Sequence, residues 1–230
     1  MTPLEDILRR QPVWRGGAPA APAAPALPSG FTALDAELPG GGWPIGALTE
    51  ILAPRDGVGE LQLVMPVLAA LTGAGRRIAW LAPPYLPYAP ALAAAGVRLE
   101  HLAVVRAPGR RDALWAAEQV LRAGACHALL AWLPEAHYAE LRRLAAAAQE
   151  RPVFAALFRP PGAARQPSPA CLRLALEWRE GRLAARILKR RGAPAATALA
   201  ISIPRPVHAL GRAPLSATSY RGAGARACAA

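Results

Sequence analysis

Between residues 47 and 158 the sequence alternates short apolar runs with longer stretches of helical periodicity, and this alternation limits the folds open to the chain. Each apolar run has the length of a strand, and enough residues for a crossover helix separate it from the next run. We expect strands at 47–52, 77–82, 101–106, 128–132 and 152–158, and helices at 31–38, 59–71, 88–95, 111–123 and 134–149, with Ser29 capping the first. Apolar strands joined by helices are typical of a mainly parallel sheet covered on both faces. The sequence therefore predicts an α/β fold.

The regions outside this alternation have different compositions. Residues 1–28 read as a short N-terminal helix followed by a linker of Gly, Ala and Pro, and the core extends over 29–191. Within it, residues 171–178 and 183–188 alternate apolar and polar side chains around a turn, which predicts a C-terminal β-hairpin at the sheet edge. Residues 192–230 are rich in Ala, Pro, Gly and Arg, and we expect a flexible basic tail there.

The net charge of +12 is concentrated in the last third of the chain. Residues 1–158 hold 14 arginines and 13 acids, whereas 159–230 hold 12 arginines and Lys189 against two acids. Such a basic region is typical of contact with nucleic acid or an acidic protein surface, although a solvated tail without a dedicated partner gives the same pattern. The candidate contact residues are Trp14 and Arg15 before the linker, and Lys189, Arg190, Arg191 and Arg205 in the C-terminal region.

Other chemistry has little support in the sequence. The three cysteines lack CxxC spacing and the four histidines are isolated, so we expect no metal, no disulfide and no cofactor. Trp80 and Trp132 are expected to pack on the sheet, while Trp43 is either an exposed aromatic or a buried turn anchor. We find neither an N-terminal signal nor an apolar run long enough to span a membrane, and expect a cytoplasmic protein.

The segment from Ala53 to Leu61 follows an apolar strand and precedes an apolar helix, which is where a phosphate-binding loop lies in a P-loop protein. Pro54, Gly57 and Gly59 can form such a turn. A functional loop also needs a Lys for the β/γ oxygens, and here Glu60 or, in another register, Gly59 stands at that position. A carboxylate there repels a triphosphate, so we interpret the segment as a degenerate P-loop.

Several short motifs, taken in order and spacing, resemble known proteins. Residues 27–35 (Leu-Pro-Ser-Gly-Phe-Thr-Ala-Leu-Asp) and 40–50 (Gly-Gly-Gly-Trp-Pro-Ile-Gly-Ala-Leu-Thr-Glu) look like the entry to the core of RecA recombinases. Within that superfamily the chain resembles the ImuA family of translesion-synthesis accessory proteins and their relatives, the SulA cell-division inhibitors. The stretches that carry this finer likeness are 48–50, 57–61, 81–83, 131–134 and 158–160.

The resemblance implies a RecA-like core, yet the catalytic parts of that core are missing. RecA proteins carry a catalytic Glu after the second strand, where this chain has Ala82-Pro83-Pro84-Tyr85. They also carry an Asp at the end of an apolar strand, where this chain has Trp132. The nearest acid, Glu135, is expected in the first turn of the next helix. Since phosphoryl transfer needs phosphate clamping, metal and positioned water together, we expect no catalytic residues and no ATP hydrolysis.

By resemblance, the chain is a non-catalytic subunit of an SOS-induced translesion complex. Its implied partners are an ImuB-like inactive polymerase, an error-prone DNA polymerase and RecA, with non-specific DNA contact through the basic C-terminus. The alternative is a SulA-like inhibitor of the tubulin-like division protein. SulA proteins typically stop soon after the motif at 158–160, which favours the first reading. An active ATPase with unusual motifs is the third reading.

Overall fold

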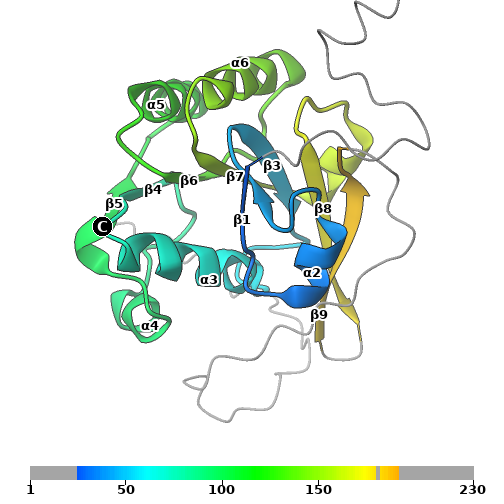
Figure 1. Cartoon of the computed structure of the whole chain (residues 1–230). Coiled ribbons are helices and arrows are strands. Elements are labelled where there is room, and N and C mark those ends of the chain that lie inside the picture. The colour runs from blue at the N-terminus through cyan, green and yellow to red at the C-terminus, as the bar shows by residue number, and fades with distance from the viewer. Residues whose placement is uncertain (1–24, 180–181, 192–230) are drawn as a thin grey trace, which may run out of the picture.

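The computed structural model describes residues 25–179 and 182–191 (Figure 1). The predicted N-terminal helix, most of the predicted linker and the predicted basic tail lie outside the described residues, as do Trp14, Arg15 and Arg205. Ala26 and Leu27, from the end of the region read as a linker, form strand β1 (Ala26–Leu27), which pairs antiparallel with β2 (Trp43–Pro44).

A seven-stranded sheet forms the centre of the molecule, with the order β5-β4-β6-β7-β3-β8-β9. Its strands are β3 (Ala47–Leu52), β4 (Ile78–Leu81), β5 (Leu102–Val105), β6 (Ala128–Trp132), β7 (Phe154–Arg159), β8 (Leu172–Arg179) and β9 (Arg182–Lys189). Every neighbouring pair is parallel except β8 and β9, which are antiparallel. The predicted α/β class with a mostly parallel sheet is confirmed.

Helices cover both faces of this sheet (Figure 1). Helices α3 (Glu60–Gly73) and α4 (Ala89–Ala94) lie on one face, and α5 (Arg110–Ala123) and α6 (Tyr138–Gln149) lie on the other. The short elements α2 (Thr32–Glu37), η1 (Leu99–His101) and η2 (Pro161–Arg165) complete the described chain. Because the parallel strands all point the same way, the loops after β3, β4, β5, β6 and β7 meet at one edge of the sheet.

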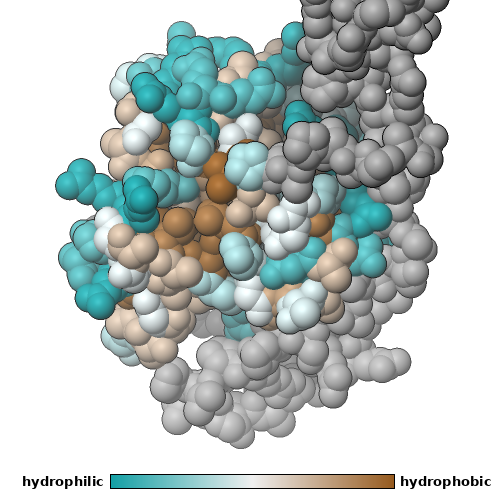
Figure 2. Space-filling view, viewed as in Figure 1, coloured by the Kyte–Doolittle hydropathy of each residue, from teal (hydrophilic) through white to brown (hydrophobic). Residues whose placement is uncertain are grey.

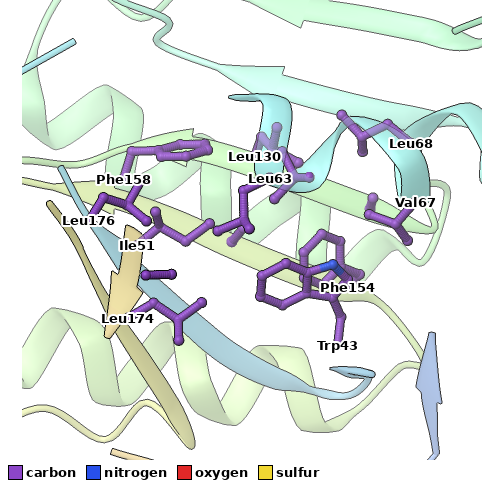
Figure 3. Packing of buried hydrophobic residues seen from close by; sticks show 14 of the residues in the cluster. Trp43, Ile51, Leu63, Val67, Leu68, Leu130, Phe154, Phe158, Leu174 and Leu176 are labelled. Atoms are coloured by element: carbon purple, nitrogen blue, oxygen red, sulfur yellow. The ribbon is translucent and has the colours of Figure 1, made fainter. Parts of the chain in front are cut away.

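The strands are apolar on both sides because a hydrophobic core lies on each face of the sheet. Alternate strand residues point to opposite faces, so one set packs under α3 and the other under α5 and α6. In Figure 3, Leu63 and Val67 of α3 lie over the sheet, and the rings of Trp43 and Phe154 pack with centroids 5.4 Å apart. Trp43 is fully buried, so of its two predicted roles the exposed aromatic is wrong.

The two helical layers differ in surface character. Hydrophilic side chains cover α5 and α6, whereas apolar side chains gather in the middle of the viewed face, around α3 (Figure 2). Leu61, Met65 and Leu71 of α3 pack only partly against the core. The amphipathic pair α5 and α6 thus forms a solvated surface, and α3 is apolar nearly all round.

Two local predictions are wrong. Helix α6 begins at Tyr138 and not at Pro134, because His137 and Glu140 form a capping box that fixes the helix start, so Glu135 lies in the preceding loop. Ser29 does not cap α2; the cap position is Phe31, whose backbone N–H donates to the Ser29 hydroxyl.

Candidate functional site

The loop between β3 and α3 is closed by its own carboxylate. Glu60 is the first residue of α3, and its side chain folds back over the loop. The backbone N–H of Gly57 donates to Glu60 Oε1 at 2.9 Å, and the N–H of Gly59 donates to Oε2 at 3.1 Å. Glu60 is only 4% exposed. A carboxylate of the chain therefore occupies the position where amides of a phosphate-binding loop would hold an anion.

Glycine makes this loop shape accessible. Gly57 and Gly59 have φ values of +75° and +105°, a region that L side chains rarely adopt. The left-handed turn at Gly59 directs its N–H toward the Glu60 side chain, and the negative carboxylate also lies at the favourable N-terminal end of the α3 dipole. Of the four residues assigned to a degenerate P-loop, Gly57, Gly59 and Glu60 thus form one hydrogen-bonded unit, and Pro54 lies beside it on the exposed rim.

The neighbouring strand ends supply no acid toward this loop. After β4 the chain turns through Ala82, which has φ +49°, into Pro83 and Pro84. At the end of β6, Trp132 stacks on Phe158 with ring centroids 4.7 Å apart. Trp80 and Trp132 are 1% and 8% exposed, so the prediction that they pack on the sheet is confirmed.

A hollow of about 360 Å³ opens between the loop and these strand ends. Its lining combines Pro54, Arg55, Asp56 and Glu60 with residues that follow β4, β6 and β7, among them Pro84, Trp132, Pro134 and Pro160. Carboxyl ends of parallel strands are the usual place for a ligand in such folds. Eight of its twelve lining residues are apolar and four of these are proline, which suits contact with an apolar side chain better than with a triphosphate.

A buried ionic network lies directly beneath this hollow, and sequence reasoning missed it. Glu50 of β3 is fully buried and accepts from Arg159 Nη1 at 2.8 Å and from Arg173 Nε at 2.5 Å. Arg159 also donates to the carbonyl of Ala136 and to the side chain of Gln166. The network joins β3, β7 and β8 to the loops above them, so the hollow has a rigid floor. The only signal in the sequence was that Glu50 and Arg159 both fall in motifs of the resemblance.

The C-terminal basic candidates are partly engaged within the fold. Lys189 Nζ donates to the carbonyl of Ser168 at 2.8 Å, and Arg190 forms an ion pair with Glu37 at 2.9 Å. Arg191 is exposed. The structure therefore places Lys189 and Arg190 at surface contacts at the end of β9, away from the loop at Glu60.

Among the described residues, three groups have shifted pKa values. Burial raises the pKa of the Cys126 and Cys171 thiols above the ordinary value for cysteine. Burial and then the charge of Arg76 lower the pKa of His127, whose Nε2 lies 2.8 Å from Arg76 Nη1. Within the described residues, no three His, Cys, Asp or Glu side chains gather in a way that could hold a metal ion.

Comparison with known proteins gives one family match. The family described as the cell division inhibitor SulA matches residues 46–154, just under half of the chain, and this is consistent with a SulA-like family. The matched region runs from the residue before β3 to the first residue of β7, so it contains the loop at Glu60 and α3 to α6. No curated protein matches the chain. In the part of the chain that is described, no helix has the length and apolarity required to cross a bilayer.

Proposed function

We propose that this chain is a non-catalytic accessory subunit of an SOS-induced, mutagenic translesion DNA synthesis complex, built on a degenerate RecA-like core. Its partners are an ImuB-like inactive polymerase and an error-prone DNA polymerase, with RecA as a further partner. The coarser part, a non-enzymatic inhibitor or accessory role, is the role that the SulA match suggests.

The observation that carries the proposal is the Glu60 carboxylate in the loop after β3. Two loop amides already donate to it, and a bound phosphate would have to displace this buried anion and bring its own negative charge to the same place. The positions that would supply metal and a positioned water hold Ala82 and Trp132. These features support binding rather than phosphoryl transfer.

A phosphate-release assay with ATP, Mg²⁺ and single-stranded DNA tests the non-catalytic part. We expect release at the rate of a buffer blank, with or without DNA. DNA-stimulated release would overturn this part of the proposal.

The accessory role is tested by co-purification of the chain with the ImuB-like protein of the same organism, at low and high salt. A complex that survives high salt supports an apolar interface on the core. A complex lost with salt places the contact in charged segments, and deletion of residues 192–230, which hold four arginines and no acid, then identifies the C-terminus as the site.

A second function is favoured by the family match itself, since SulA is described as an inhibitor of cell division. In this reading the chain binds the tubulin-like division protein. No complex with the ImuB-like protein at either salt, together with filamentation of cells that overexpress the chain, would favour the inhibitor over the lesion-bypass subunit.

A further inference from the structure

Three hollows join into one groove along the carboxyl edge of the sheet. The first, of about 240 Å³, lies after β4, β5 and β6 and shares Ala82, Trp132 and Pro134 with the hollow beside Glu60. That hollow in turn shares Pro54 and Arg55 with a third, of about 480 Å³, which lies over the end of β3 and the middle of β8 and β9. The groove therefore follows the carboxyl ends of β5, β4, β6, β7 and β3 and continues over the middle of β8 and β9, a span of roughly 29 Å at the usual strand spacing.

The walls of this groove are rich in proline. A proline follows each of β3, β4, β5, β6 and β7 within three residues, and after β4 it is the second of two prolines, Pro84, that lines the groove together with Pro54, Pro108, Pro134 and Pro160. Proline fixes φ and removes a backbone donor, so these loops lose little conformational entropy when something binds. The floor is held by the Glu50–Arg159 pair, whose side chains are at most 1% exposed.

One unpaired cation lies in the middle of the groove. Arg55 is exposed, lines both the second and third hollows, and makes no hydrogen bond or ion pair with any described residue. Most other charged side chains of the groove are engaged: Arg110 with Glu140, Arg186 with Glu177, and Glu60 with the loop amides. The carboxylate of Glu135, in the first hollow, is exposed. Asp56 lines the second hollow beside Arg55, and its negative charge disfavours more than one acidic residue in a ligand that binds there.

From this pattern we propose that the groove binds one extended segment of a partner protein, in which a single acidic residue lies between apolar residues. The acid pairs with Arg55, and the apolar side chains on either side enter the first and third hollows. About nine residues of extended chain match the span. The inference rests on the proposed function, because it assumes that the chain acts by binding a protein partner.

The test is an array of twelve-residue peptides that tile the ImuB-like protein, the tubulin-like division protein and this chain itself, probed with the full-length chain. We expect the wild type to bind peptides with one acid between apolar residues. Arg55→Glu should weaken that binding at least about tenfold, since it replaces an attractive pair with a repulsive one. Ala107→Trp, which fills the first hollow, should weaken it as well.

The matched control is Arg98→Glu, which makes the same charge change at an exposed arginine before η1, at the opposite edge of the sheet. It should leave binding within about twofold of the wild type. The far-ultraviolet circular dichroism of all variants shows whether they are folded.

Peptides that bind Arg55→Glu as well as they bind the wild type would overturn the groove proposal. Strongest binding to peptides from this chain itself would overturn it as well.

Failure of the groove proposal can be distinguished from failure of the proposed accessory role. If the ImuB-like protein co-purifies equally with wild type and Arg55→Glu, the groove proposal fails and the accessory role stands. If only peptides of the division protein bind, and through Arg55, the groove stands and the partner assignment changes.

Discussion

Glu50 and Arg159, 109 residues apart in the sequence, form an ion pair whose side chains are 0% and 1% exposed. Arg173, from a third strand, completes the contact on the other carboxylate oxygen. A carboxylate with no access to water is tolerated only when it is paired and hydrogen-bonded, and here two guanidinium groups share it.

Replacing Glu50 by Gln should therefore destabilise the protein strongly. The substitution keeps the shape but leaves two buried arginines without a counter-ion, and we expect a loss of about 3–5 kcal/mol in the free energy of unfolding. Urea denaturation of the purified variant measures this loss. A loss below about 1 kcal/mol would show that the network has little effect on stability.

Two further variants serve as comparisons for Glu50→Gln, one at a distant exposed acid and one at the network itself. Glu100→Gln removes an exposed acid whose partner Arg98 is 3.8 Å away, and should change stability by no more than about 0.5 kcal/mol. Replacing all three network residues by apolar ones (Glu50→Leu, Arg159→Met, Arg173→Met) should be less harmful than Glu50→Gln alone, because no buried charge is then left unpaired.

The loop carboxylate gives a second prediction. Glu60→Ala removes the acceptor for two backbone amides and the negative charge at the start of α3, and should cost about 1–2 kcal/mol. Thermal unfolding compares this variant with Glu135→Gln, an exposed acid in a nearby loop. Equal melting temperatures for the two variants would argue against a structural role for Glu60.

The strands and most helices could be predicted because local pattern decides them. β4 and β6 are buried along their whole length, so each reads as an uninterrupted apolar run. The first residues of α6 and α2 were predicted wrongly. Proline in a first turn and serine before a helix are both common signals of a helix start. In the structure, the hydrogen bonds between His137 and Glu140 and between Ser29 and Phe31 place the two starts further along the chain.

The site could be predicted only in part. The absence of a lysine from the loop and the presence of Glu60 can be read from the sequence. Whether the Glu60 side chain points away from the loop or accepts hydrogen bonds from its amides depends on the φ values of Gly57 and Gly59. Arg173 alternates with leucines in β8, a pattern that normally places the charge in solvent. Its burial depends on Glu50, 123 residues away, and no local pattern reports such a pairing.

The Gly-rich turn before β3 gives a third prediction. A Cβ at Gly42 would lie 2.1 Å from the carbonyl oxygen of Leu27, so Gly42→Ala must push β1 away from β2. We expect a loss of about 2 kcal/mol or more in the free energy of unfolding. Gly73→Ala is the control, since nothing lies within 4 Å of that Cβ, and in a helix it should stabilise by about 0.5–1 kcal/mol. Similar losses for both variants would contradict the close approach at Gly42.

The pH dependence of stability should include a contribution from His127. Its pKa is lowered by burial and by Arg76, so the folded state binds a proton less readily than the unfolded chain does. The stabilisation that comes from keeping His127 neutral is therefore complete above the unfolded pKa of about 6.5 and decreases as the pH falls below it. His127→Gln should flatten the dependence of the free energy of unfolding on pH between about pH 7 and pH 5.

Arg76→Gln should raise the pKa of His127, which a proton NMR titration of the ring measures directly. A titration of His127 unchanged by Arg76→Gln would show that the contact at 2.8 Å does not affect its protonation.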